Sequence, residues 1–189
     1  MGKYVSIFSL ILLSLLTASI LTPGSIFASD QKEAGISAVL TRPEIKLQED
    51  RRVVVLKKFL ESYKSPLADS AQTLVKTADD NNLDWRLIAA ISGVESTFAH
   101  QLPSNSYNAW GWGIYGDNMI YFKSYDDAIS TIAKGLREKY MDKWGAQDVY
   151  QIGRFYAASP TWASRVDYFM QKIHQFELDN PENSLAMSL

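Results

Sequence analysis

The sequence predicts a mainly α-helical domain that carries one short irregular or hairpin-bearing lobe. Apolar residues recur at a spacing of three and four over six segments between residues 44 and 178, which is the pattern of amphipathic helices. This spacing is lost between residues 99 and 123, where Pro, Ser, Asn and Gly interrupt the chain. A connection of this length inside a compact domain is usually functional, so we expect the lobe to lie beside a cleft.

The first 28 residues have the features of a secretory signal peptide. One cation, Lys3, precedes a largely apolar stretch over residues 4–21, and small residues follow up to Ala28. The alternative is an uncleaved anchor, because the stretch approaches the length that spans a bilayer. In either case we expect the domain to be secreted or held in the cell envelope, and to touch a membrane only through this segment. Residues 29–43 lack periodicity and are expected to form a linker.

Residues 44–179 are long enough for one domain with a sizeable core, and residues 180–189 are expected to form a flexible tail. The chain has no cysteine, which excludes disulfides, thiol nucleophiles and cysteine-bound metals. Its two histidines, His100 and His174, lie too far apart for a short metal motif, so we expect no metal and no cofactor. Removing Lys3 with the signal leaves 18 of the 19 basic residues against 21 acidic ones, which provides no surface for nucleic acid. We expect a monomer.

The first two predicted helices cover residues 44–63 and 67–82. Pro66 separates them, and Asn81 with Asn82 marks the end of the second. Their apolar positions are Leu47, Val54, Val55, Phe59 and Leu60 in the first helix and Ala71, Leu74, Val75 and Ala78 in the second.

The third predicted helix follows Asp84, a good N-cap residue, and ends near Glu95. Leu87, Ile91 and Glu95 are spaced by four, so the carboxyl shares a stripe with two core residues. Apolar surroundings disfavour the anion and raise the pKa of a carboxyl, which is what a general acid requires. The alternative is a helix-end glutamate that pairs with a neighbouring cation. Ser96 is expected to brace the helix end, because no histidine lies near it in the sequence to activate a nucleophile.

Short strands are expected in the irregular lobe, near residues 113–115 and 119–122. Three further helices are expected over residues 124–141, 146–158 and 160–178. Ser124 and the acids after it open the first of these, and Pro160 is expected in the first turn of the last.

Three segments, in this order, resemble the lysozyme-like peptidoglycan-cleaving enzymes. Residues 87–98, Leu-Ile-Ala-Ala-Ile-Ser-Gly-Val-Glu-Ser-Thr-Phe, look like the helix of lytic transglycosylases and bacterial glucosaminidases that ends in a catalytic Glu followed by Ser. Residues 108–113, Asn-Ala-Trp-Gly-Trp-Gly, are similar to the glucosaminidase pattern of Asn, one residue, an aromatic residue and Gly. Residues 156–163, Tyr-Ala-Ala-Ser-Pro-Thr-Trp-Ala, resemble the glucosaminidase segment Tyr-Ala-Thr-Asp-Pro-x-Tyr-Ala. The match extends over about residues 67–176.

The resemblance implies a lysozyme-like α+β fold and a glycosidase that cleaves β-1,4 bonds in the glycan strands of peptidoglycan. It implies Glu95 as the general acid and Tyr156 as the group that binds the N-acetyl substituent or steadies the intermediate. The alternative for Tyr156 is a core tyrosine whose hydroxyl is satisfied within the protein. An inverting hydrolase needs a second carboxyl, for which Asp117 is the candidate, although a turn role in Gly-Asp-Asn is the alternative. The residues expected to contact the sugar chain are Asn108, Trp110, Trp112, Tyr115 and Trp162, with a place in the core as the alternative for Trp110.

Two departures from these families bear on the reaction. Lytic transglycosylases usually follow the glycine with Leu-Met-Gln, whereas this chain has Trp112-Gly113-Ile114-Tyr115. Ser159 stands where many glucosaminidases have Asp, so that position offers no carboxylate. The comparison favours an endo-β-N-acetylglucosaminidase. A lytic transglycosylase that forms 1,6-anhydromuramoyl ends is the first alternative, and a non-catalytic peptidoglycan-binding protein is the second.

Overall fold

The computed structural model describes residues 49–113 and 120–181. The chain divides into two units, Met1–Glu44 and Ile45–Leu189, and the described residues belong to the second unit. The predicted signal peptide (1–28) and linker (29–43), and nearly all of the predicted tail, therefore lie outside the described residues. None of the helices in the described part combines the length and the apolar character needed to cross a bilayer.

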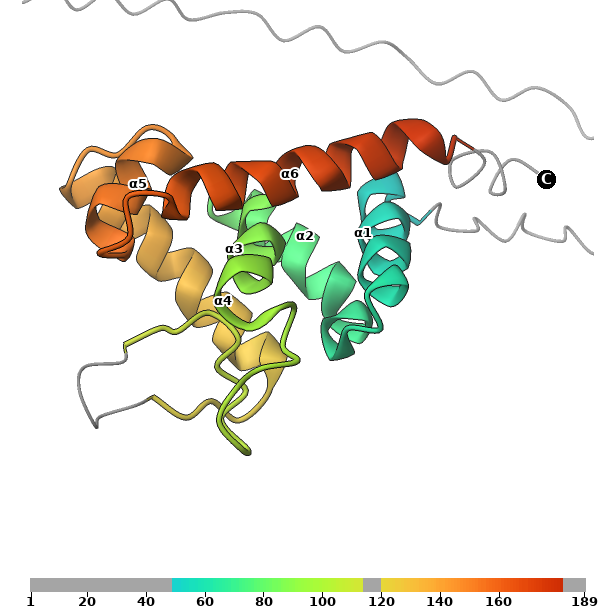
Figure 1. Cartoon of the computed structure of the whole chain (residues 1–189), viewed down its shortest axis with the longest axis horizontal. Helices are drawn as coiled ribbons and strands as arrows, with labels where there is room; N and C mark the ends of the chain where they lie inside the picture. The colour runs from blue at the N-terminus through green and yellow to red at the C-terminus, as the bar shows by residue number, and fades with distance from the viewer. Residues whose placement is uncertain (1–48, 114–119, 182–189) are drawn as a thin grey trace, which may run out of the picture. The chain divides into compact units, whose positions relative to one another are not determined.

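The described part of the chain is mainly helical, as the sequence predicts (Figure 1). No strand occurs within residues 49–113 or 120–181, so Gly113 and residues 120–122 are not in the short strands expected there. The remaining residues of those two expected strands lie outside the described part. The helical elements are α1 (Arg51–Ser62), η1 (Pro66–Ser70), α2 (Ala71–Asp80), α3 (Leu87–Ser96), α4 (Tyr125–Gly135), η2 (Leu136–Lys143), α5 (Val149–Tyr156) and α6 (Trp162–Asp179).

Side-chain caps define several helix starts. The Ser124 hydroxyl accepts the backbone N–H of Asp127 at the start of α4, which confirms the predicted start of that helix. Asp148 does the same for α5 by accepting the Gln151 N–H, so that α5 begins at Val149, three residues later than the sequence predicts. The first helix was expected from residue 44, but α1 begins at Arg51, where the Asp50 carboxylate accepts the N–H of the second helical residue.

Other predicted boundaries are wrong because local hydrogen bonding overrides the apolar periodicity. The segment 67–82 divides into a 3₁₀ turn, η1, and then α2, since Ser65 caps the turn by accepting the Leu67 N–H. Asp84 caps the turn before α3 rather than α3 itself, because its carboxylate accepts the Arg86 N–H. The segment 124–141 passes from α4 into the π-helical element η2. Pro160 precedes α6, which begins at Trp162.

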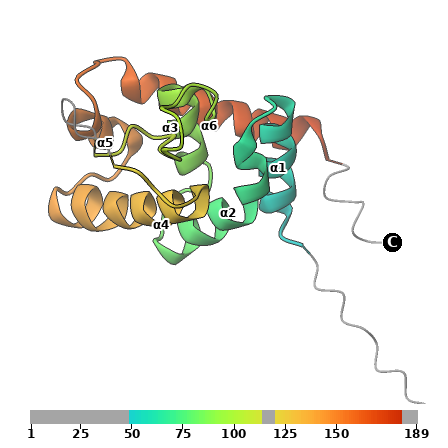
Figure 2. The ribbon, with the colours of Figure 1, turned by 90° about the horizontal axis from the view of Figure 1, so that it is seen from below.

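The core is built around α3, whose middle residues are completely buried. The apolar run Ile88-Ala89-Ala90-Ile91 has no exposed surface, so α3 is surrounded by other elements. The long helix α6 packs along α3 and also contacts α1 and α5, while α2 lies against α4 (Figures 1 and 2). This arrangement brings the last turn of α3 close to the first turn of α6.

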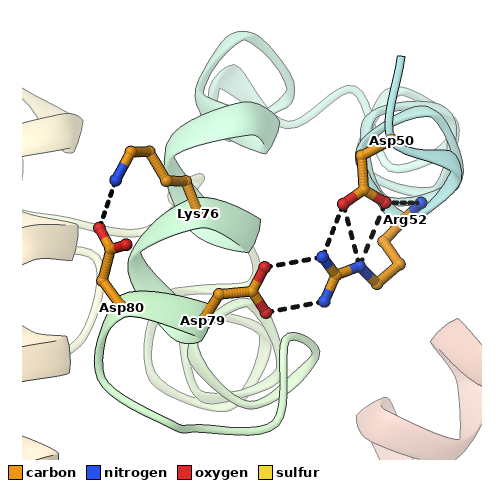
Figure 3. A network of polar contacts seen from close by, with 5 residues as sticks. All are labelled: Asp50, Arg52, Lys76, Asp79 and Asp80. Carbon is orange, nitrogen blue, oxygen red and sulfur yellow. Dashed lines mark hydrogen bonds and ion pairs between the residues drawn. The ribbon is translucent and has the colours of Figure 1, made fainter. Parts of the chain in front are cut away.

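A polar network fastens the start of α1 to the end of α2 (Figure 3). The Arg52 guanidinium donates to both carboxylate oxygens of Asp79 at 2.7 Å, and it also donates to the cap residue Asp50. These bonds lower the pKa of both carboxyls, because they favour the ionised form. A separate pair, Lys76 with Asp80, spans one turn of α2 at 2.5 Å. All of these groups are accessible to water, so each pair contributes modestly to stability.

Candidate active site

Glu95 occupies the last turn of α3 and is held there by the first residue of α6. The indole Nε1 of Trp162 donates a hydrogen bond to Glu95 Oε1 over 2.6 Å. The Trp162 ring is itself buried and stacks on the Tyr156 ring, with centroids 4.6 Å apart and an interplanar angle of 20°. Gly153 lets the indole pack closely, because a Cβ there would lie 3.1 Å from Trp162 Cε3. The acid is therefore oriented by a ring that cannot easily move.

The second carboxyl oxygen of Glu95 faces a glycine. Gly111 has a φ of +61°, a conformation that favours glycine, and a Cβ there would lie 3.2 Å from Glu95 Oε2. Because Oε1 already accepts the Trp162 N–H, the proton of the neutral acid is best placed on Oε2. The absence of a side chain at position 111 leaves that oxygen approachable.

The pKa of the Glu95 carboxyl is raised from its ordinary value. Desolvation by burial is the main cause, and it is opposed by the Trp162 hydrogen bond and by the positive charge of Arg165. Glu95 as a whole residue is exposed, whereas its carboxyl is closely surrounded by protein. The surroundings of the carboxyl decide the direction of the shift, because the charge resides on its two oxygens and not on the aliphatic stem.

The chain leaves α3 through an unusual left-handed turn. Thr97, Phe98 and Ala99 have φ values of 53°, 56° and 68°, and none of them is glycine. The Ser96 hydroxyl accepts the Ala99 N–H at 2.9 Å and lies 2.8 Å from the carbonyl oxygen of Ala109. As expected, Ser96 braces the helix end, and it also ties the end of α3 to the Trp-Gly segment. Strain in this turn is offset by complete burial of the Phe98 ring.

Asn108 and Trp110 shape the loop from within. The buried Asn108 side chain donates to the carbonyls of Trp112 and Ile120, at 2.8 and 3.1 Å, and accepts the Trp112 N–H at 2.9 Å. Trp110 is 0% exposed, and its Nε1 donates to the Ile88 carbonyl at 2.8 Å. Neither side chain presents a surface to a ligand in this structure, although both were expected to contact sugar.

Tyr156 lies near Glu95 without touching it through a hydrogen bond. Its hydroxyl donates to the carbonyl oxygen of Trp110 at 2.8 Å. Burial raises the pKa of this hydroxyl well above its ordinary value, and the negative charge of Glu95 adds to the shift, so Tyr156 stays protonated. The Trp162 indole contacts both side chains, by stacking on Tyr156 and by its hydrogen bond to Glu95.

A pocket of about 320 Å³ borders Gly111 and Tyr156. Glu95 and Trp162 are not among its described lining residues, but Glu95 lies against Gly111 and Trp162 stacks on Tyr156, so these two residues connect the acid to the pocket. Half-buried Trp112 lines the pocket, and its ring also packs against α4 and η2. Its expected contact with sugar stays a prediction. The described lining residues are Gly111, Trp112, Gly113, Ile120, Lys139, Tyr140, Phe155 and Tyr156.

Four lining side chains were not identified from the sequence: Ile120, the η2 residues Lys139 and Tyr140, and Phe155 of α5. The sequence offers weak signals for two of them. Phe155 directly precedes the Tyr156 motif, and Tyr140 stands four residues before another aromatic residue, Trp144. Two predicted site residues, Tyr115 and Asp117, lie outside the described residues.

Within residues 49–113 and 120–181, no three His, Asp or Glu side chains are grouped so that they could bind a metal ion. No model of a known protein family and no curated protein sequence matches this chain.

Proposed function

We propose that the chain is an exported cell-wall glycosidase that cleaves β-1,4 bonds in peptidoglycan, as an endo-β-N-acetylglucosaminidase with a lysozyme-like catalytic domain. One observation carries the proposal. The Glu95 carboxyl has a raised pKa, accepts the Trp162 N–H, and has its Oε2 next to Gly111, a residue that also lines an aromatic pocket. Export rests on the sequence of residues 1–28.

Glu95 supplies the chemistry of glycoside cleavage as its proton donor. A carboxyl with a raised pKa keeps its proton closer to neutral pH and delivers it to the leaving oxygen as the bond breaks. The resulting carboxylate is stabilised by the Trp162 N–H and by the nearby charge of Arg165. The same two groups that limit the pKa shift in the resting protein therefore favour the state that follows proton transfer.

The cationic sugar centre needs a second stabilising group. The described groups that act on the pKa of Glu95 are Trp162 and Arg165, and neither is an acid. A mechanism with one protein carboxyl, in which the N-acetyl group of the substrate assists, fits these neighbours. The same neighbours, Trp162 and Arg165, fit a lytic transglycosylase equally well, because attack by the muramoyl 6-hydroxyl also requires only one protein carboxyl. Asp117 would be required only if water is activated by a second carboxylate.

Mass spectrometry of peptidoglycan digested by the full chain separates the candidate functions. Reducing N-acetylglucosamine ends identify a glucosaminidase, 1,6-anhydromuramic ends identify a transglycosylase, and binding without products identifies a non-catalytic protein. Glu95→Gln should lower cleavage by about two to four decades, because it removes the proton donor and keeps the shape. The matched control is Glu61→Gln, on the exposed face of α1. Near-complete cleavage by the Glu95 variant would refute its assignment as the acid.

The second group is identified by comparing Tyr156→Phe with Asp117→Asn. Under substrate assistance or internal attack, we expect the tyrosine variant to lose more turnover, because the hydroxyl holds the carbonyl of Trp110, the residue before Gly111, and Gly111 lies next to Glu95 Oε2. In an inverting hydrolase, loss of Asp117 should be nearly as severe as loss of Glu95.

A further inference from the structure

One of the residues that line the pocket, Phe155, has an exposed aromatic ring. It is 50% exposed, and the neighbouring Trp144, which does not line the pocket, is 38% exposed. Their ring centroids lie 4.9 Å apart, and Trp144 also contacts Tyr140 at 5.0 Å. Trp144 thus packs against the Phe155 ring and leaves half of that residue facing water. Exposed aromatic rings at a pocket rim are typical of binding surfaces.

Lys139 places a positive charge at the same rim. It is the one charged side chain among the described residues that line the pocket. Its Nζ lies 4.9 Å from the centre of the Trp144 ring, and it forms no ion pair with any carboxylate in the described part of the chain. Lys134, one turn earlier, does form such a pair, with Glu138 at 3.8 Å. The pocket therefore combines an apolar ring, which suits the face of a sugar, with a cation that has no anionic partner among the described residues.

We propose that Phe155 and Lys139 form an outer sugar subsite that selects glycans carrying a carboxylate substituent. This inference rests on the proposed function and deepens it, by naming the feature of the substrate that the protein recognises. The ring of a sugar would pack on Phe155 while its acidic substituent pairs with the Lys139 ammonium. In peptidoglycan the carboxylate comes from the lactyl group of muramic acid or from the peptide attached to it. A neutral polymer such as chitin would contact Phe155 and leave Lys139 unpaired.

The test measures binding by calorimetry with the Glu95→Gln full chain, so that turnover does not consume the probes. Three probes distinguish the sources of charge: chitotetraose, a peptide-free tetrasaccharide of N-acetylglucosamine and N-acetylmuramic acid, and the same tetrasaccharide bearing peptides. We expect one or both acidic probes to bind about fivefold more tightly than chitotetraose, with the preference shrinking as salt rises. A preference for the peptide-free probe assigns the lactyl carboxylate, and a preference confined to the peptide-bearing probe assigns the peptide.

Lys139→Gln should abolish the preference for the acidic probes over chitotetraose and leave the affinity for chitotetraose unchanged. Lys134→Gln is the matched control and should change neither the preference nor that affinity. Phe155→Ala should lower the affinity for each of the three probes by about three- to tenfold. A thermal melt checks that this variant is folded. Equal affinity for the three probes, no measurable binding of the acidic probes, or a preference that survives Lys139→Gln would overturn the proposal. Failure of the proposed function would look different, since the wild-type chain would then show this binding pattern without cleaving peptidoglycan.

Discussion

The indole N–H of Trp162 donates to Glu95 Oε1 over 2.6 Å, although 67 residues separate the two along the chain. The contact joins the first residue of α6 to the last turn of α3, the two helices that pack most extensively against each other. Trp162 is therefore a positioning residue: it fixes the orientation of the carboxyl and leaves Oε2 as the oxygen that carries the proton. Because it is buried, Trp162 contacts Glu95 and offers almost no surface to a ligand.

Trp162→Phe should raise the pKa of Glu95 further. The hydrogen bond favours the ionised carboxyl, and a phenyl ring keeps much of the coverage and the stacking on Tyr156 while removing the donor. Titration of the ¹³C-labelled glutamate carboxyl by NMR measures the change directly. Trp85→Phe, at the opposite end of α3, is the control and should leave the Glu95 titration unchanged. A lower pKa of Glu95 in the Trp162 variant would show that the indole affects this pKa mainly by burying the carboxyl, and not by donating a hydrogen bond to it.

Glu95→Gln should stabilise the protein at neutral pH. A carboxyl whose pKa is raised by folding binds its proton more tightly in the folded state, so stability declines as pH rises through the interval above the ordinary pKa of 4.5. Below that interval the Glu95 carboxyl is protonated in both the folded and the unfolded protein, so ionisation of this group does not lower the free energy of unfolding. The glutamine variant has no such loss, and it retains a side-chain oxygen for the Trp162 N–H.

Urea denaturation at pH 7 and at pH 4 tests this expectation. The free energy of unfolding of the variant should exceed that of the wild type at pH 7, and the difference should narrow at pH 4. A variant that is less stable at both values would mean that the carboxylate makes favourable contacts the glutamine cannot replace.

Much of the helical architecture can be predicted from local patterns. Ser124 is a cap residue whose side chain accepts an N–H three residues later, so its role was predicted from the sequence. Asp148 makes the same local contact but was not identified, because apolar residues before it suggested an earlier start for α5. The position of Glu95 on the stripe of Leu87 and Ile91 also follows from spacing alone. The turn η1 and the π-helical element η2 could not be predicted, because the apolar period does not reveal which carbonyl each N–H selects.

The functions of the tryptophans depend on partners far away in the sequence. Trp110 and Trp162 were both expected to contact sugar, yet one donates to the Ile88 carbonyl and the other to Glu95. A buried indole and a ligand-facing indole have the same local sequence pattern, and only tertiary packing separates them. The rim residues Phe155 and Lys139 were missed for the same reason, since η2 and α5 meet only in the folded domain.

Thr97→Gly should stabilise the domain by about 0.5–1 kcal/mol. Thr97 is exposed and adopts a φ of 53°, a left-handed conformation that costs a non-glycine residue about 1 kcal/mol or more. Thr131→Gly is the control: this threonine is exposed within α4, so glycine there should destabilise by about 0.5 kcal/mol. Urea denaturation of both variants measures the two changes. Destabilisation by Thr97→Gly would indicate that the Thr97 side chain makes contacts worth more than the strain.

Gly135→Ala tests whether the Trp112 ring is a wall of the pocket with a fixed position. Gly135 has helical backbone angles and is followed directly by η2, and at such an interior position alanine usually stabilises relative to glycine, by about 0.5–1 kcal/mol. At Gly135, however, a Cβ would overlap Cζ2 of the Trp112 ring, which packs directly over this glycine. We therefore expect the substitution to destabilise the domain and to displace the indole from Tyr140 and Tyr156, with a shift in tryptophan fluorescence.

A double-mutant cycle separates this clash from the intrinsic effect of alanine. In a Trp112→Ala background there is no ring for the new Cβ to meet, so Gly135→Ala should become neutral or stabilising there. Trp112→Ala alone should both weaken glycan binding and lower the free energy of unfolding, because the half-buried ring also packs against Tyr140. Equal effects of Gly135→Ala in the two backgrounds would mean that the indole moves away at no cost, and that the pocket wall at Trp112 is not fixed.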